Sequence, residues 1–268
     1  MDNFYDVVMG RKSVRSYDGR SLTAEDREKL LAYIAALDNP FGIPVSITLL
    51  DAAEHGLSSP VLVGETLFAA GTVGRVPNSE AAFGYSFEKL LLYAWSLGIG
   101  SVWIAGTMKR ELFERAVGVR DGERMPCISP LGYPAKKRSV REIMMRKGIG
   151  ADERKPLREL FFDGDLTVPL SESGALARVM EETRWAPSAV NKQPWRIIRR
   201  DGLWHFYEKK DKGLSGEATG DIQKIDVGIA LCHFMLGAED AGFSPALVLE
   251  APGMTLPADM EYVASVRL

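Results

Sequence analysis

Two long apolar stretches dominate the hydrophobic pattern of this chain. Residues 79–97 and 225–241 both carry large apolar side chains at about helical spacing, so each predicts a helix buried in the core. A glycine follows each stretch, Gly98 and Gly242, and glycine commonly ends helices. The short apolar runs beyond these glycines predict strands over 101–105 and 246–249.

Shorter segments predict the remaining elements. Apolar residues at helical spacing indicate a helix over 2–9, and Thr23 is placed to cap a second helix that runs to about Leu37. Helices mixed with strands in this way indicate an α+β fold. We also expect helices near 110–117 and 175–185, strands over 45–50 and 127–134, and a loop or short strand over 51–60.

The stretch from Ala186 to Trp195 is typical of a helix end that turns into a strand. Pro187 stops the preceding helical run, and Pro194 favours an extended backbone just before Trp195. The polar side chains between the two prolines can both donate and accept hydrogen bonds, which suits the edge of a heterocycle. They belong to Ser188, Asn191 and Gln193.

The second half of the chain repeats the first at an offset of 143 to 147 residues. The basic segment 154–158 echoes 11–15, and the apolar helix, glycine and strand near the C-terminus echo those around Gly98. Any two α+β halves share coarse features, but the matching basic pairs favour duplication. We therefore predict two similar halves, 1–148 and 149–268, joined near 148–151 and packed as a homodimer would pack.

Composition narrows the range of partners. The 268 residues suffice for two average domains or one large one, and 33 basic against 36 acidic residues give a net charge of -3. Neither nucleic acid nor an anionic membrane is therefore expected as a partner. The N-terminus lacks a leader pattern, and no run reaches the roughly eighteen apolar residues of a membrane span, so a cytoplasmic location is expected.

The cysteines and histidines predict no metal site. Cys127 and Cys232 are far apart in apolar surroundings, so both are expected to be reduced core residues. His233 lies on an apolar helical stripe and is expected to be a hydrogen-bonded core histidine. The sequence shows neither a Ser-His-Asp set nor an acid–base dyad, and we assign no catalytic side chain.

The stretch after Ala186 closely resembles the Pro-Ser-x-x-Asn-x-Gln-Pro-Trp motif of the nitroreductase flavoproteins. Arg11, Ser13 and Arg15 are similar to the Arg-x-Ser-x-Arg motif of the same family, although the two motifs usually lie close together in sequence and here lie far apart. The resemblance implies central antiparallel sheets flanked by helices, with FMN bound where two subunits meet.

A fused pair of halves would explain the separation of the motifs, since one FMN site would then take residues from both. The resemblance implies that Arg11, Lys136 and Arg138 hold the phosphate, and that Arg15 with Lys12 faces the anionic edge of reduced flavin. The mirror-image site, built from Arg154, Lys155 and Arg158 with 39–44, lacks the motif and is expected to be lost. The full set expected around FMN is Arg11, Lys12, Ser13, Arg15, Ile104, Ala105, Gly106, Lys136, Arg138, Pro187, Ser188, Ala189, Asn191 and Gln193.

The resemblance predicts an FMN-dependent oxidoreductase in which NADPH or NADH passes hydride to flavin N5. A small electron-poor acceptor, such as a nitroaromatic or quinone-like compound, would then be reduced, and the chain would be a monomer with one FMN. One alternative is a protein that binds flavin without turnover. Another is a flavin-fragmenting or dehalogenating relative, with a substrate lid at 51–80 or 208–222.

Overall fold

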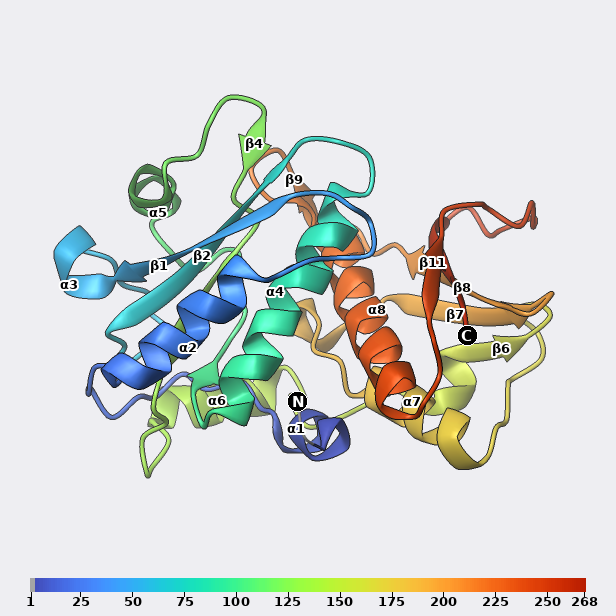
Figure 1. Cartoon of the computed structure of the whole chain (residues 1–268), viewed down its shortest axis with the longest axis horizontal. Coiled ribbons are helices and arrows are strands. Elements are labelled where there is room, and N and C mark those ends of the chain that lie inside the picture. The colour runs from blue at the N-terminus through green and yellow to red at the C-terminus, as the bar shows by residue number, and fades with distance from the viewer. Residues whose placement is uncertain (1–2) are drawn as a thin grey trace.

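Two five-stranded sheets lie at opposite ends of the molecule, with two long helices between them (Figure 1). The computed structural model describes residues 3–268. The first sheet has the order β1-β2-β5-β3, and β4 pairs with β2 beside it. Its antiparallel strands are β1 (Val45–Asp51), β2 (Leu67–Gly74), β3 (Gly100–Ser101), β4 (Glu123–Arg124) and β5 (Ile128–Gly132).

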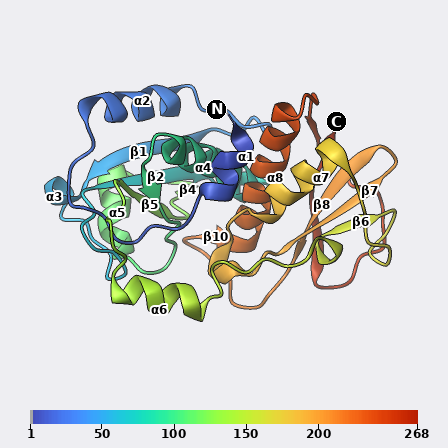
Figure 2. The same cartoon turned by 90° about the horizontal axis from the view of Figure 1, so that it is seen from below.

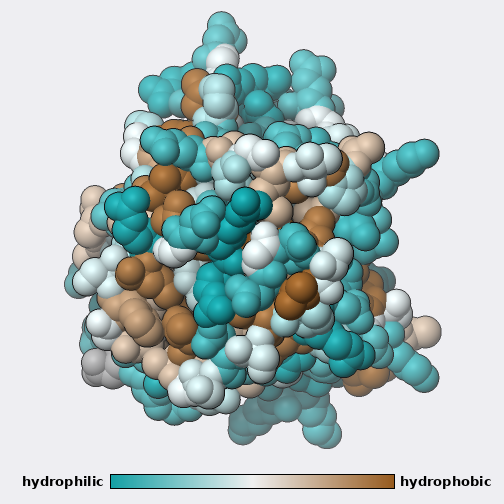
Figure 3. Space-filling view, turned by 90° about the vertical axis from the view of Figure 1, so that its right-hand side faces the viewer, coloured by the Kyte–Doolittle hydropathy of each residue, from teal (hydrophilic) through white to brown (hydrophobic). Residues whose placement is uncertain are grey.

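The second sheet has the order β11-β12-β8-β7-β6. Antiparallel sheets were expected, but this sheet is mixed, because β6 pairs with β7 in parallel. Hydrophilic side chains cover most of the molecular face on this side (Figure 3). The strands are β6 (Phe161–Asp163), β7 (Trp195–Arg200), β8 (Leu203–Lys209), β11 (Ala246–Val248) and β12 (Met260–Arg267), and β9 (Ser215–Gly216) with β10 (Gly220–Asp221) forms a separate hairpin.

Helices surround the first sheet and fill the space between the two. Figure 2 shows α2 and α6 on opposite sides of the first sheet, with α4 and α8 at the centre of the molecule. No helix within residues 3–268 combines the length and apolar character needed to cross a membrane. The helices are α1 (Phe4–Gly10), α2 (Ala24–Ala35), α3 (Ala52–His55), α4 (Ser79–Ser96), α5 (Arg110–Val117), α6 (Val140–Gly148), α7 (Gly174–Arg184) and α8 (Ile222–Asp240).

Helices α4 and α8 approach each other backbone to backbone. A β-carbon added at Gly84 would lie 2.1 Å from the carbonyl oxygen of Ile225, and one added at Gly228 would lie 2.1 Å from that of Ala81. The two contacts are reciprocal, since Gly84 and Gly228, like Ala81 and Ile225, lie 144 residues apart, within the range of 143 to 147 residues that relates the two halves. Only glycine permits so close an approach at these positions.

The long amphipathic and apolar elements were predicted correctly. Helices α1, α2, α4, α5, α7 and α8 and strands β1, β5 and β11 are confirmed, and the hydroxyl of Thr23 accepts from Asp26 N at 3.1 Å as a cap. Cys127 and Cys232 are buried and free. His233 is buried, with Nδ1 3.0 Å from the carbonyl oxygen of Glu182 and Nε2 3.1 Å from Oε1 of Glu88.

Three segments differ from the expectations. Residues 52–55 form a helix because the carboxylate of Asp51 accepts from the amides of Ala53 and Glu54. The strand expected over 101–105 is only Gly100–Ser101, followed by a single bridge between Ile104 and Ile128. Residues 51–80, considered for a substrate lid, contain the buried strand β2, so this part of the stretch cannot act as a lid.

Candidate functional site

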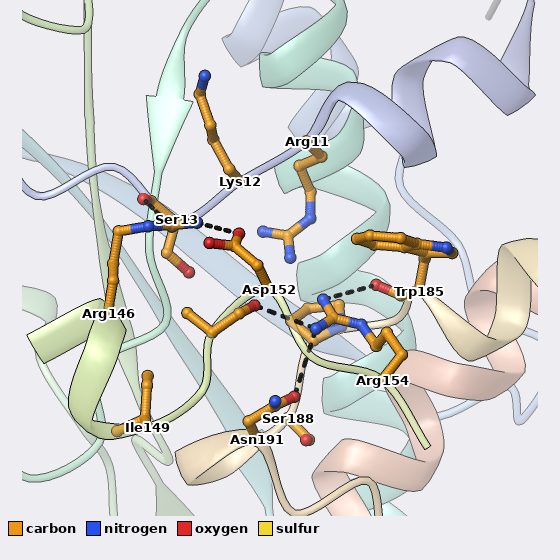
Figure 4. A pocket seen from close by; sticks show the side chains of 12 residues that line it. Arg11, Lys12, Ser13, Arg146, Ile149, Asp152, Arg154, Trp185, Ser188 and Asn191 are labelled. Atoms are coloured by element: carbon orange, nitrogen blue, oxygen red, sulfur yellow. Dashed lines mark hydrogen bonds and ion pairs between the residues drawn. The ribbon is translucent and has the colours of Figure 1, made fainter. Parts of the chain in front are cut away.

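A small cavity lies where the segment after α1, the connector after α6 and the turn after α7 meet (Figure 4). Its volume is about 60 Å³. Six predicted site residues line it, three from each of the two separated motifs. The lining consists of Arg11, Lys12, Ser13, Arg146, Ile149, Ala151, Asp152, Arg154, Trp185, Pro187, Ser188 and Asn191.

The N-terminal side of the cavity is fixed by backbone pairing and by one buried acid. Val14 N donates to the carbonyl oxygen of Ser101 at 2.9 Å, which holds this segment alongside β3. The side chain of Arg11 is only 3% exposed, and its Nε lies 3.5 Å from Oε1 of Glu88. Its Nη1 is buried with no hydrogen-bond partner among the described residues, and the guanidinium points into the cavity (Figure 4). Arg11 therefore presents an unused cationic donor to any ligand in the cavity.

Arg154 enters the same cavity from the connector. Its guanidinium lies 4.8 Å from the ring centre of Trp185, and its Nη1 donates to the carbonyl oxygens of Ala151 at 3.1 Å and Glu153 at 2.7 Å. Its Nε is buried without a partner among the described residues. Burial, and next the charge of Arg11, lower the pKa of Arg154 to about 10. The shift reflects burial first, and the neighbouring charge of Arg11 adds to it.

The charges around the cavity favour an anion. Arg11, Lys12, Arg146 and Arg154 supply four cations, and Asp152, which pairs with Arg146, is the carboxylate in the lining. Guanidinium groups bind phosphate and carboxylate oxygens with charge-assisted hydrogen bonds. The arrangement therefore suits a phosphate or a similar oxyanion.

The turn after α7 holds an unusual backbone conformation. Val190, Asn191 and Gln193 have φ angles of 42°, 57° and 50°. A β-branched residue such as Val190 rarely adopts this left-handed region, and such strain is often found at ligand sites. Ser188 Oγ accepts from Gln193 N at 2.9 Å, and Ala189 N lies 3.1 Å from both carboxylate oxygens of Asp226. These contacts keep the turn in place.

Asn191 and Gln193 bind the connector. Asn191 Nδ2 donates to the carbonyl oxygens of Gly150 at 2.7 Å and Glu153 at 3.0 Å. Gln193 Oε1 accepts from Lys155 N at 2.8 Å, and Gln193 is itself buried outside the cavity lining. The amides predicted to meet a heterocycle edge are thus satisfied by the chain's own backbone.

The other predicted residues lie outside the cavity lining. Burial lowers the pKa of Arg15, an effect partly opposed by Glu142, which accepts from Arg15 N at 3.3 Å. Arg138 lies 3.5 Å from Glu142 and borders a neighbouring pocket that also contains Arg146. Lys136 and Gly106 are exposed. Ile104 is buried and forms a β-bridge with Ile128, and the carbonyl oxygen of Ala105 accepts from Arg110 Nη2 at 2.8 Å.

Sequence reasoning missed part of the cavity. Arg146 lies on α6, a helix that the pattern did not predict, and Asp152 and Trp185 carry no motif of their own. The sequence marks Arg154 only as the counterpart of Arg11, in a mirror site expected to be lost, whereas the structure places both arginines in one cavity. Asn39, from the expected mirror segment, bonds within its own turn and to Ser86.

Asp226 makes the turn sensitive to pH. Burial raises its pKa well above its usual range; the amide of Ala189 opposes this shift, and the nearby carboxylates of Asp221 and Glu208 add to it. An acid whose pKa is raised by folding contributes stability that is complete below its ordinary pKa and is lost as pH rises through the folded value. We expect Asp226→Asn, which keeps an acceptor for Ala189, to be more stable than the wild type by at least about 1 kcal/mol at pH 8.

The measurement is urea unfolding at pH 5 and pH 8. The advantage of Asp226→Asn should grow with pH, whereas Asp259→Asn, a change of an exposed acid, serves as the control and should show no such trend. Equal stability of Asp226→Asn and the wild type at both pH values would contradict the assignment.

The residues fit FMN in chemistry, but the cavity does not fit it in size. Two buried arginine nitrogens of the cavity lining, Arg11 Nη1 and Arg154 Nε, lack partners among the described residues, and a phosphate would supply an acceptor. Pockets for drug-sized ligands have about 300–1,000 Å³, well above the 60 Å³ found here. A phosphate therefore has room, and the isoalloxazine ring has none while residues 149–155 occupy this position.

Comparisons with known proteins agree on one family. A family model described as "Putative TM nitroreductase" matches residues 3–238. The structure of a "putative nitroreductase" from Thermotoga maritima is 19% identical, has a TM-score of 0.63, and covers 98% of this chain and 93% of its own. That likeness shows the shared fold. No curated protein matches the chain.

Other solved structures match about half of the chain. A nitroreductase with bound FMN from Bacteroides fragilis is 19% identical over 52% of this chain and 95% of its own, with a TM-score of 0.42. An FMN-dependent nitroreductase from Clostridium difficile is 17% identical over 53% of this chain and 94% of its own, with a TM-score of 0.42.

Proposed function

Since this chain belongs to the nitroreductase family and is therefore an oxidoreductase, we propose that it binds one FMN and reduces a small electron-poor acceptor with NADPH or NADH. One observation carries the proposal. Arg11, Lys12 and Ser13 of the first motif and Pro187, Ser188 and Asn191 of the second line one cavity, although more than 170 residues separate them in sequence. The meeting of both motifs supports a composite site.

We assign the residues by their chemistry. Arg11 would hold the FMN phosphate, with Arg154 as a second cation, and Ser188 and Asn191 would face the ribityl chain or the ring edge. FMN, when bound, supplies the hydride chemistry, and the protein supplies binding, orientation and positive charge. Lys136 and Arg138 lie outside the lining and would contribute only after a rearrangement.

We also propose that the chain consists of two related halves, 1–148 and 149–268. The reciprocal close contacts of Gly84 and Gly228 support this division, because a two-fold related pair of helices makes each contact twice. In such a chain, the surfaces that two subunits of a homodimer would bury against each other are buried within one molecule. A monomer of 29.5 kDa is therefore expected, and sedimentation at twice this mass would contradict it.

The absorbance spectrum of the purified protein tests the proposal directly. Oxidised flavin bands, with about one FMN per chain released on denaturation, are expected, and NADPH or NADH should bleach them without oxygen. Two FMN per chain would contradict the single composite site. A protein that stays colourless after prolonged incubation with FMN would overturn the proposed FMN-dependent activity altogether.

Flavin binding without turnover is the second candidate. The connector, residues 149–155, bears on this candidate, because it covers the second motif and leaves room for neither the flavin ring nor a substrate until it moves. Reduction of bound FMN by either nicotinamide nucleotide, followed by reoxidation with a quinone, would exclude this candidate.

A further inference from the structure

Residues 149–155, the connector that follows α6, lie across the candidate site and are hydrogen-bonded to it. Asn191 binds the carbonyl oxygens of Gly150 and Glu153, and Gln193 binds Lys155 N. Arg154 adds its contacts with Ala151 and Glu153 and its packing against Trp185. The side-chain amides of Asn191 and Gln193 therefore find their hydrogen-bond partners in the backbone of the connector, at both of its ends.

The space left under the connector is small and strongly cationic. A volume of about 60 Å³ holds roughly four to six waters, at about 10–15 Å³ for each water. This is the size of a tetrahedral oxyanion. Arg11 Nη1 and Arg154 Nε are both buried there without partners among the described residues, although a buried cationic donor normally has one. An oxyanion beside Arg11 Nη1 would give that donor an acceptor, and the charge of Arg154 in the same lining would stabilise it.

We propose that the cavity under the connector is a binding site for a small phosphate-like oxyanion, and that the connector 149–155 must leave Asn191 before FMN can enter the same site. The second clause rests on the proposed function, whereas the first does not. Inorganic phosphate and FMN should compete, because both need Arg11. Free phosphate and the phosphate group of a larger ligand share this chemistry, and the two arms of the experiment separate them.

The first arm is calorimetric titration of inorganic phosphate into flavin-free protein at constant ionic strength. Wild-type protein should bind one phosphate, and Arg154→Gln should bind it at least about tenfold more weakly, since it loses a charge-assisted hydrogen bond. Lys192→Gln is the matched control: it removes one positive charge next to Asn191 but from a separate groove. Wild-type protein that binds no phosphate up to about 10 mM would overturn the proposal.

The second arm follows the rate of FMN uptake by fluorescence quenching. Phosphate should slow uptake by the wild type, and Arg154→Gln, which loosens the connector, should take up FMN faster in phosphate-free buffer. Rates that depend on neither phosphate nor this variant would overturn the role of the connector while leaving the FMN proposal intact. Phosphate binding without any FMN uptake would instead support the oxyanion site and remove the proposed function.

Arg11→Gln provides an additional check on the shared cation. It should weaken phosphate binding and slow FMN uptake together. Because it also removes the cationic partner of buried Glu88, its result counts only if its circular dichroism spectrum matches that of the wild type. Arg154→Gln carries the test if it does not.

Discussion

Replacing Gly84 with alanine is expected to destabilise the protein by about 2 kcal/mol. The new β-carbon would lie 2.1 Å from the carbonyl oxygen of Ile225, so α4 and α8 must move apart. Overpacking of this kind costs about 3 kcal/mol, while the higher helix propensity of alanine returns about 1 kcal/mol. Urea unfolding of the variant and the wild type measures the difference.

The reciprocal variant and a matched control sharpen this test. Gly228→Ala should cost about as much, since its β-carbon would meet the carbonyl oxygen of Ala81 at the same distance. At Gly148, at the end of α6, a new β-carbon would meet no atom of residues 3–268 within 4 Å, so Gly148→Ala should be neutral or slightly stabilising. If Gly84→Ala and Gly148→Ala were equally stable, the backbone contact between α4 and α8 would be disproved.

The sequence predicted the amphipathic elements and also the long apolar helices α4 and α8, which are buried along most of their length. Helix α5, for example, was predicted near 110–117 and runs from Arg110 to Val117. Strand β2 escaped because nearly all its residues are buried, so no alternation marks it. Helix α6 does carry a local signal that the expectations did not use: Ser139 caps it by accepting from Glu142 N, and Val140 and Met144 stand at helical spacing.

The site was predictable only as far as its motifs extend. The sequence predicted Arg11 and Asn191, which both line the cavity, because the residue types and order of the two motifs are distinctive. The contribution of Arg154 depends on how the connector folds back over the second motif, and the hydrogen bonds of Asn191 to the connector are tertiary contacts that no local pattern specifies. Because the connector folds back in this way, Asn191, which was predicted to meet the edge of the flavin ring, bonds to protein backbone instead.

The second large effect is expected at Glu88, the buried acid that supports Arg11. Its side chain is fully buried and accepts from Trp103 Nε1 at 2.7 Å, with Arg11 Nε at 3.5 Å and His233 Nε2 at 3.1 Å. Glu88→Gln keeps the shape but leaves Arg11 without its buried counter-charge. Breaking a buried pair on one side costs about 3–5 kcal/mol, so we expect a loss of about 3 kcal/mol at pH 7.

The loss should depend on pH in a defined direction. Burial alone would raise the pKa of Glu88, but Arg11, followed by His233 and Trp103, lowers it below its ordinary value of 4.5. The ionised carboxylate therefore contributes stability that is present above pH 4.5 and is lost as pH falls through the lowered pKa. The difference in unfolding free energy between wild type and Glu88→Gln should be largest near neutral pH and shrink in acid.

The control for this series is Glu25→Gln, which removes an exposed acid that pairs with Lys29 at 2.6 Å. Exposed pairs contribute little, so no measurable change is expected. A Glu88→Gln protein as stable as the wild type at pH 7 would show that the pair does not stabilise the fold. If it were destabilised and also bound phosphate more weakly than the wild type, Glu88 would be identified as a positioning residue, because it acts on the cavity only through Arg11.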